Sequence, residues 1–474
     1  MFDPVSYVMG KQAGGGGGDI TVESLSVTEN GTTTAPSGKA YSPVVVSVPN
    51  SYTVSDEGKV VSNGALVAQT AMTATQNGTV DTTLNNSVTV NVQAPVIPAP
   101  IKDVVFVDYD GEIVQEYTSQ EFLALTEMPA NPTHTGLTAQ GWNWTLADAK
   151  TYVQSHGCLC IGQNYTTSDG KTRVHIHITE QVYTRGLTLK FNLNNPTTLV
   201  VDWEDGNTET VSGNGNKSVT HTYSAVGDYL LTVNCTSGAY GWGDTTTATM
   251  GVSGPAAIAI TEINIGSGVT RLYGNAFAYA SNCQKISIPT GISDFSSGRD
   301  YGYALAGRCF VYPSGTTNIQ KTGSPIFISV PKSVTAISSS FGSQTRMITL
   351  PEGASITGYG KSLQRAERIS IPGLSGAVGG SSNATTWGTS WYCRSFTFGT
   401  GVTSIAQLGF NAMRCSEIHL LATTPPTLSS ANAFSLTYLK KIYVPYSADH
   451  SVLEAYQTAT NWSSFTSIIE EEPQ

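Results

Sequence analysis

Short apolar strand motifs recur at a near-constant spacing through the second half of the chain, and this periodicity constrains the fold most. The motifs alternate apolar and polar residues, as in Ile286-Ser-Ile288 and Ile369-Ser-Ile371. Their second apolar positions lie 23, 42, 20, 21, 27, 22 and 24 residues apart, the interval of 42 being about two repeats; these positions are Ile265, Ile288, Val330, Leu350, Ile371, Phe398, Leu420 and Val444. A period of about 20 to 29 residues is typical of solenoids, in which each repeat buries its apolar side only by stacking on its neighbours.

Companion segments lie between these motifs, among them Val269-Thr-Arg-Leu272, Val334-Thr-Ala-Ile337 and Val402-Thr-Ser-Ile405. Together, motifs and companions resemble the BspA-like leucine-rich repeats. The resemblance implies a leucine-rich-repeat-like solenoid over residues 255–474. Near its end, Ser451-Val-Leu-Glu454 has the form of a capping box, which predicts a terminal helix that closes the stack.

Residues 185–254 carry a second pattern. Val201-Asp-Trp-Glu-Asp-Gly206 stands where PKD-type immunoglobulin-like domains have a Trp-x-Phe-Gly-Asp-Gly turn, and Gly227-Asp-Tyr-Leu-Leu-Thr-Val233 resembles one of their closing strands. The resemblance implies a β-sandwich. Val201, Trp203 and Glu204 depart from the family's Trp, Phe and Gly, so we expect the turn to pack differently.

Residues 101–184 are predicted to form an α+β module. Val104–Val107 reads as a strand that turns at Asp110-Gly111 and returns through Ile113-Val114. Capping boxes at Thr118–Glu121 and Thr145–Asp148 predict two helices. A hairpin around Asp169-Gly170 would place His175 opposite Asn164.

The first hundred residues are expected to be small and modular. Asn-Gly turns followed by alternating valines predict small β modules over residues 20–100, which end in a proline-rich linker. Residues 1–19 combine a short apolar stripe with a glycine tether, so we expect a helix that docks into a partner, the alternative being an untethered terminus. The anchoring residues would be Phe2, Pro4, Val5, Val8 and Met9.

Composition narrows the classes of partner. The net charge is −10 and no cluster of Lys and Arg occurs, which argues against nucleic acid. Only 12% of residues are charged, and the 48 glycines indicate short strands and turns. No secretory signal and no apolar run of membrane-spanning length is evident, so we expect no membrane insertion. Seven scattered cysteines are expected to be reduced.

Several sequence patterns could indicate metal binding or catalysis. Cys158-x-Cys160 with His175-x-His177 has donors that suit zinc, but the spacing is wrong for zinc knuckles. The carboxylates at Asp108–Asp110 and Asp202–Asp205 suit either calcium or plain Asp-Gly turns, and we favour turns. No familiar catalytic motif occurs. We therefore predict no enzyme activity, no cofactor and no metal.

Aromatic residues in glycine-rich stretches provide the one hint of a binding site. Tyr240 and Trp242 form one group, and Trp387, Trp391 and Tyr392 form another. Such rings stack on sugars and other flat or apolar ligands. The alternative, which carries equal weight, is that they fill gaps in the core.

The segments Glu57–Val67 and Asn77–Asp81 resemble fibre and minor structural proteins of phages that infect gut Firmicutes, a resemblance that covers most of residues 1–98. It implies a mainly β, multidomain virion protein, a tail or head fibre or appendage. Expected partners are other virion proteins at the N-terminus, a bacterial surface glycan or protein at the solenoid, and further copies of the chain, for which a trimer is one option. The alternatives are a secreted bacterial BspA-like adhesin and a virion-associated cell-wall hydrolase.

Overall fold

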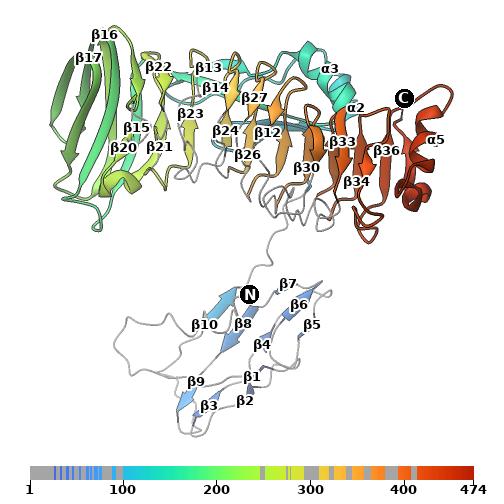
Figure 1. Ribbon diagram of the computed structural model, residues 1–474. Helices are drawn as coiled ribbons and strands as arrows, with labels where there is room; N and C mark the ends of the chain where they lie inside the picture. The colour runs from blue at the N-terminus through green and yellow to red at the C-terminus, as the bar shows by residue number, and fades with distance from the viewer. Residues whose placement is uncertain are drawn as a thin grey trace. The chain divides into compact units, whose positions relative to one another are not determined.

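The computed structural model describes residues 100–473 except 246–250, 274–275, 278, 293–308, 320–324, 338–343, 357–364, 379–392 and 407–413, and before residue 100 it describes only short strands between residues 26 and 91. The chain divides into two compact units, residues 1–100 and 101–474. The prediction of a mainly β chain with several sheets is confirmed (Figure 1). The predicted anchor residues Phe2, Pro4, Val5, Val8 and Met9 lie outside the described part.

The described strands of the first unit are short and pair antiparallel, in the orders β1-β2, β3-β9, β10-β8-β4 and β5-β6-β7. The valine-rich segments at residues 44–48 and 88–92 contain β4 and β10, which flank the same central strand. The bounds are β1 (Ser26–Val27), β2 (Thr33–Thr34), β3 (Lys39–Tyr41), β4 (Val45–Val46), β5 (Thr53–Val54), β6 (Val60–Ser62), β7 (Ala65–Leu66), β8 (Gln69–Met72), β9 (Ala74–Gln76) and β10 (Val88–Asn91).

The second unit begins with a four-stranded sheet and two helices, residues 101–167, which we call the docked module. Its strands are β11 (Val104–Val107), β12 (Ile113–Tyr117), β13 (Leu137–Trp142) and β14 (Leu159–Thr167), in the order β12-β11-β14-β13. The predicted turn joins β11 to β12, with the Gly111 amide donating to the Asp108 carbonyl. The helices are α2 (Ser119–Leu123) and α3 (Leu146–His156), and their predicted caps, Thr118 and Thr145, each accept a backbone N–H.

The hairpin predicted after β14 is wrong. The chain turns at Gly170, where φ is +75°, but β15 (Thr172–Ile178) pairs with β18 (Gly227–Ser237) and β21 (Ile260–Asn264) instead of β14. His175 consequently lies opposite Leu230 and Glu262. The two strands bury their side chains in different places. The apolar side chains of β15 belong to the main core, whereas those of β14 pack inside the docked module or between this module and the strands that follow residue 308.

A long, bent strand organises the next region. β16 (Gly186–Asp202) pairs antiparallel with β17 (Thr208–Thr222) along almost its whole length. Its second half also pairs with β18, and its first half with β19 (Tyr240–Trp242) and β20 (Val252–Ser253). Because β18 continues through β15 into β21, one hydrogen-bonded sheet crosses the domain boundaries expected at residues 184 and 254. The second unit is thus a continuous body.

Beyond residue 254 most strands pair in parallel. The first elements are η1 (Pro255–Ala259), β21, β22 (Val269–Leu272) and β23 (Lys285–Ser287). An eight-stranded sheet follows, which we call the parallel sheet: β24 (Cys309–Val311), β26 (Phe327–Ser329), β28 (Met347–Thr349), β30 (Arg368–Ile371), β32 (Ser395–Phe398), β34 (Glu417–Leu420), β36 (Lys441–Val444) and β37 (Ile469–Glu471). β24 falls inside the 42-residue interval, as expected from two repeats.

The register of the parallel sheet follows the apolar motifs. Ile348, Ile369, Phe396, Ile418 and Ile442 lie side by side on successive strands, and all are buried in one continuous core. Companion strands pair in parallel on a second side, in the orders β25-β27-β29 and β31-β33-β35. Their bounds are β25 (Asn318–Ile319), β27 (Ala336–Ile337), β29 (Ser355–Ile356), β31 (Ser375–Val378), β33 (Gly401–Ile405) and β35 (Thr427–Leu428).

A helical cap ends the stack, as expected, but its first turn differs from the prediction. α5 (Ser451–Thr458) and η2 (Trp462–Ile468) bury Tyr456 and Trp462 against the last repeats, and β37 adds to β36. His450, in the left-handed region at φ +56°, precedes α5 without a side-chain cap. The Ser451 hydroxyl is bonded to Asp449, so the predicted capping box does not form.

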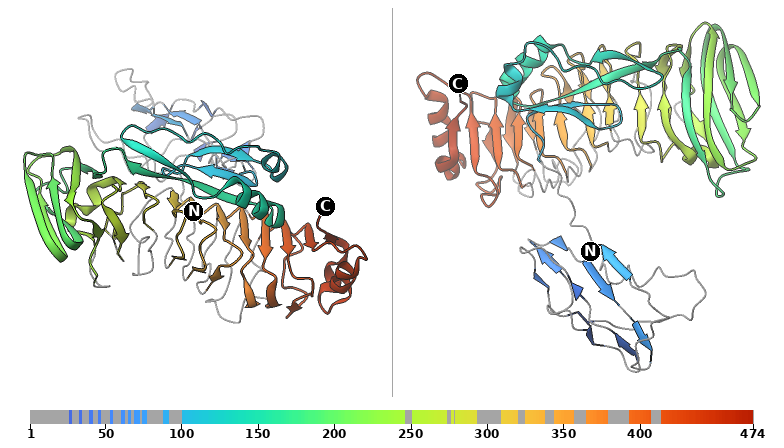
Figure 2. Two further views of the ribbon diagram at one scale, coloured as in Figure 1. Left: turned by 90° about the horizontal axis from the view of Figure 1, so that it is seen from above. Right: turned by 180° about the vertical axis from the view of Figure 1, so that it is seen from behind.

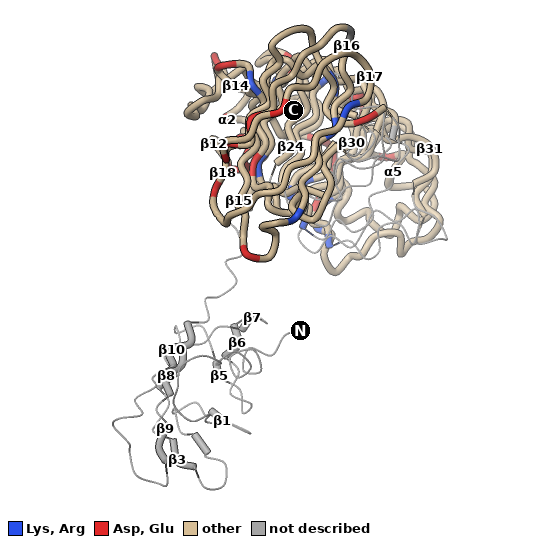
Figure 3. Tube along the Cα trace, turned by 90° about the vertical axis from the view of Figure 1, so that its left-hand side faces the viewer, with Lys and Arg blue, Asp and Glu red and all other residues tan. Residues whose placement is uncertain are grey.

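Charged residues are sparse on this body. Lys and Arg, blue in Figure 3, and Asp and Glu, red, are scattered along several elements of a mostly uncharged trace. Among the described helices, none is long and apolar enough to cross a membrane.

Candidate functional site

The outer face of the parallel sheet, opposite the continuous core, changes character along the stack. Strands alternate their side chains between two faces, so the first and third residues of each short strand point outward. On β24, β26 and β28 these outward residues are mainly apolar: Cys309, Val311, Phe327 and Met347. On β30 to β36 they are polar: Arg368, Ser370, Ser395, Thr397, Glu417, His419, Lys441 and Tyr443.

The docked module covers the apolar half. Val105, Val107, Cys158 and Cys160 pack on Cys309, Val311, Phe327 and Met347 in one buried cluster. Both views in Figure 2 show the cyan module lying along the row of strands. Burial of apolar surface is the main driving force for such packing, so residues 101–167 complete the core of the stack from outside.

Polar side chains of the docked module reach the carbonyl groups of several strand ends. The Asn143 amide donates to the Tyr312 carbonyl at 2.9 Å, and the Trp144 indole donates to Val330 at 2.9 Å. The Tyr152 hydroxyl donates to Leu350 at 2.7 Å, and the Asn164 amide to Ile288 at 3.1 Å. Buried carbonyl groups need such partners, so these bonds fix where the module sits along the stack.

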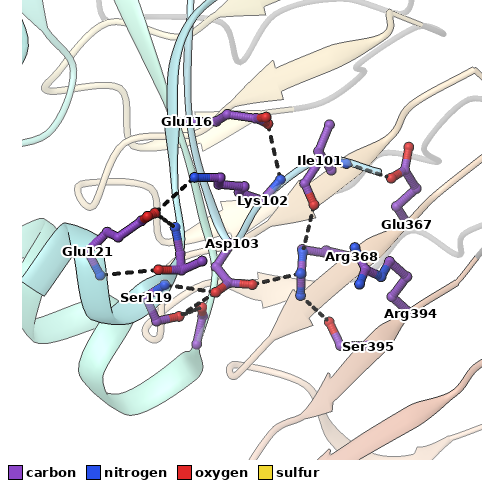
Figure 4. A network of polar contacts seen from close by, with 12 residues as sticks. Ile101, Lys102, Asp103, Glu116, Ser119, Glu121, Glu367, Arg368, Arg394 and Ser395 are labelled. Atoms are coloured by element: carbon purple, nitrogen blue, oxygen red, sulfur yellow. Dashed lines mark hydrogen bonds and ion pairs between the residues drawn. The ribbon is translucent and has the colours of Figure 1, made fainter. Parts of the chain in front are cut away.

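Charged residues mark the boundary between the covered and open halves (Figure 4). Arg368 donates to Asp103 at 2.7 Å, and the Glu367 carboxylate accepts the Ile101 N–H at 3.0 Å. Arg346 also donates to Glu367, at 2.6 Å. Asp103 in turn accepts the Ser119 N–H at 2.7 Å, which ties the start of α2 to the same network.

Beside this boundary lies a cleft of about 500 Å³. One wall is the C-terminal end of α3, with Ser155 and His156. The other is the outer face of β32 and β34, where Thr397 is buried and Glu417 and His419 are partly exposed. Among the described lining residues, four carboxylates (Asp103, Glu352, Glu417 and Glu472) stand against one arginine, Arg368. The cleft is therefore rich in hydrogen-bond acceptors and hydroxyl groups and has an excess of negative charge.

His156 forms part of the wall. Its side chain is only 4% exposed, and its Nε2 lies 3.6 Å from a Glu352 oxygen. Burial lowers the pKa of His156 below its ordinary value, with the nearby Glu352 charge acting in the opposite direction. Burial raises the pKa of the neighbouring Cys158 thiol to about 12, so this cysteine stays protonated and is a poor nucleophile.

The far end of the cleft carries an aromatic pair. The His419 imidazole stacks on the Tyr443 ring, with centroids 4.8 Å apart and planes 19° apart. His419 Nδ1 lies 2.5 Å from a Glu472 oxygen. Burial, together with nearby carboxylates, raises the pKa of Tyr443 to about 12, which keeps its phenol a neutral donor. Glu472 follows β37, so the cap of the stack helps to position the site.

The structure corrects the predicted aromatic site. Tyr240 is 1% exposed and Trp242 is fully buried, and both rings pack edge-on against Phe191, at 5.6 and 5.3 Å between centroids. Their faces are therefore inside the core, where they join β19 to its neighbours, and they are closed to ligands. The other three predicted residues, Trp387, Trp391 and Tyr392, lie outside the described residues.

The residues of the possible zinc and calcium patterns do not come together in one site. His177 contacts Asp228 at 2.7 Å, whereas Cys158 and Cys160 are buried between the docked module, to which they belong, and the parallel sheet. Within the described ranges, no group of three or more His, Cys, Asp or Glu side chains is placed to hold a metal ion. The two Asp-Gly segments form turns, in which Asp108 contacts His134 at 2.7 Å and Asp205 contacts His221 at 2.7 Å.

Comparison with known proteins adds no relative. The sequence matches no protein-family model, and the search of curated proteins finds no match. Sequence reasoning missed the cleft, although a signal was present. The outward positions of successive motifs change from Cys309, Phe327 and Met347 to Arg368, Ser395 and Glu417, and that change marks where the cover ends.

Proposed function

We propose that this chain is a bacteriophage virion protein, a tail or head fibre or appendage, that binds the bacterial surface through the uncovered half of the outer face of a leucine-rich-repeat-like solenoid. The observation that carries the proposal is the cleft of about 500 Å³ beside the polar half of the outer face. Clefts of this size are typical of small-ligand sites. The repeated parallel strands at the motif positions support the BspA-like assignment, and the long antiparallel strands β16–β18 support the PKD-like one.

A surface glycan is the ligand class that suits the lining. Sugar hydroxyl groups both donate and accept, and the cleft offers carboxylate acceptors (Glu417, Glu472) beside exposed hydroxyl groups that do both (Ser155, Thr400). A flat imidazole–phenol stack lies next to them. The side chains come from adjacent strands and from α3 of one continuous body, so the site is pre-organised and loses little entropy on binding.

The remaining parts of the proposal concern assembly. Residues 1–19 would attach the chain to other virion proteins, and residues 20–100 would act as a spacer. Several copies on one particle would raise avidity by factors of about 10² to 10⁴ even if each site binds weakly. We propose recognition without turnover.

Binding to host cells tests this proposal. The purified full chain should bind host cells or block adsorption of the phage, more strongly when it is made multivalent, and should release no sugar or peptide fragments. Glu417→Ala with His419→Ala should reduce binding about tenfold or more, since two polar contacts are lost. Glu180→Ala, an exposed carboxylate in the turn between β15 and β16, is the matched control and should bind normally.

Three outcomes would contradict the proposal. Release of soluble fragments would favour a hydrolase. Presence of the protein on bacterial cells and not in purified virions would favour the adhesin. Unchanged binding by the double variant would move the site away from the cleft.

A further inference from the structure

Two cysteines from adjacent repeats meet inside the stack. Cys393 lies two residues before β32, and Cys415 lies two residues before β34. Their sulfur atoms are 3.1 Å apart, and both side chains are buried. The two thiols also face the backbone in the same way, because Cys393 Sγ lies 3.5 Å from the Ser395 carbonyl oxygen and Cys415 Sγ lies 3.0 Å from that of Glu417.

This arrangement follows from the register of the repeats. Ser395 pairs with Glu417, so the residues two positions earlier are also neighbours, and the Ser416 N–H donates to the Cys393 carbonyl at 3.2 Å. Cys283 occupies the equivalent position before β23, with its sulfur 3.4 Å from the Lys285 carbonyl oxygen. Its neighbour in register is Ile260, so Cys283 has no thiol beside it in the preceding repeat.

The geometry suits a covalent bond. Neighbouring strands lie about 4.8 Å apart, within the range of about 4.4 to 6.8 Å over which disulfides span Cα atoms. The sulfur atoms need to approach by about 1 Å to reach a bond of about 2.05 Å. A small cavity of about 10 Å³ adjoins Cys415, so the packing around this side chain is not complete.

We propose that Cys393 and Cys415 form an inter-repeat disulfide when the protein meets a low-molecular-weight disulfide outside the reducing cytosol. The thiolate of one cysteine attacks the small disulfide, releases one small thiolate and forms a mixed disulfide. The thiolate of the other cysteine then attacks the protein sulfur of that mixed disulfide and releases the second small thiolate. Two protein thiols are oxidised, one small disulfide is reduced, and the two protons end on the two small thiols.

The bond would hold β32 to β34, the two strands whose outward residues Thr397 and His419 line the cleft. It would close a loop of about 20 residues and restrict the unfolded chain. Burial raises the pKa of Cys393, so we expect the reaction to be slow in the folded protein and faster in mild denaturant. The bond stands independently of any ligand.

Oxidation of the full chain by oxidised glutathione tests the bond. Free thiols should fall from seven to five, and non-reducing peptide mapping should recover one cross-linked pair that contains Cys393 and Cys415. The Tm should rise by about 5 °C and return when a reductant is added. Cys393→Ser and Cys415→Ser should each abolish the cross-link and the shift, whereas Cys283→Ser, the repeat-equivalent control, should keep both.

Glutathione adducts without the Cys393–Cys415 peptide would overturn the proposal, and so would a Tm that does not rise in the cross-linked wild-type chain. Both readouts use the wild-type protein, so they remain decisive if a serine variant fails to fold. Neither measures binding to host cells, which keeps this test separate from that of the proposed function.

Discussion

Arg368 of β30 donates to the Asp103 carboxylate at 2.7 Å, and this ion pair joins the start of the docked module to the strand at which the outer face changes from covered to open. The two side chains are 13% and 23% exposed, so solvent screens the pair only in part. The Ile101 N–H bond to Glu367 and the Tyr152 bond to the Leu350 carbonyl lie at the same edge, and together with them the pair sets the edge of the cleft.

Replacing Arg368 with Met should loosen the docked module. The change leaves the Asp103 carboxylate without its main cation in a half-buried place, and we expect a loss of about 2 kcal/mol. Hydrogen exchange of the β11 amides measures the free energy of this local opening. Lys102→Met breaks the exposed pair between Lys102 and Glu121, which are 40% and 52% exposed, and should change the free energy of local opening far less, because solvent screens this pair. Equal effects of the two variants would contradict the assignment.

Aspartate at Ile371 should destabilise the stack. Ile371 is a predicted inward position, and the structure confirms that it is fully buried. An unpaired carboxylate there should cost several kcal/mol, and because neighbouring repeats complete each other's cores, the loss should extend to adjacent strands. Urea unfolding followed by circular dichroism measures the loss. The exposed Ser375→Asp in β31 is the control, and an unchanged midpoint for Ile371→Asp would contradict the register.

The substitution Met347→Asp tests whether the docked module covers the outer face at β28. Met347 points away from the continuous core, so an uncovered sheet would tolerate the change, whereas the docked module buries it completely. We expect a loss of several kcal/mol and faster proteolysis within residues 101–167. Glu417 lies in the same outward column on the open half, and Glu417→Ala should change the free energy of unfolding by less than about 0.5 kcal/mol. A mild effect at Met347 would mean that the module does not dock there.

Stability should depend on pH through His156. Burial lowers its pKa in the folded state below the ordinary value of 6.5, so the unfolded chain binds the proton more readily. The free energy of unfolding should therefore be at its maximum for this group above pH 6.5 and should decrease as the pH falls towards the folded-state pKa. Urea midpoints from pH 8 to pH 5 should show the decrease in the wild type and a flatter curve in His156→Asn. The same pH dependence in the wild type and in His156→Asn would contradict this role of His156.

Removing residues 1–12 should separate attachment from folding. These residues are the predicted anchor, and all described strands of both compact units follow them in the sequence. The truncated chain should remain folded by circular dichroism but should be missing from purified virions. Its incorporation at the wild-type level would place the attachment point elsewhere.

Residue type and spacing were enough to predict the local elements. The motif strands lie where the alternation of apolar residues predicted them. The interval of 42 residues contains one further strand, β24, which pairs with β26. Stacked strands bury their inward residues in only one register, so a regular spacing of apolar residues predicts their positions. The N-caps of α2 and α3 could also be predicted, because the Thr118 and Thr145 side chains accept hydrogen bonds from backbone N–H groups only three residues away. These are short-range consequences of residue type and spacing.

The candidate site depends on contacts between segments that are far apart in the chain. The cleft exists because residues 101–167 cover half of a sheet built from residues 309–471, and no local pattern says which distant segment will bury Met347 or leave Glu417 open. The same holds for Tyr240 and Trp242, which a glycine-rich context suggested as ligand contacts. They became core because β19 pairs with both β16 and β22. Burial is a property of distant neighbours, and sequence reveals it only where a repeat makes those neighbours predictable.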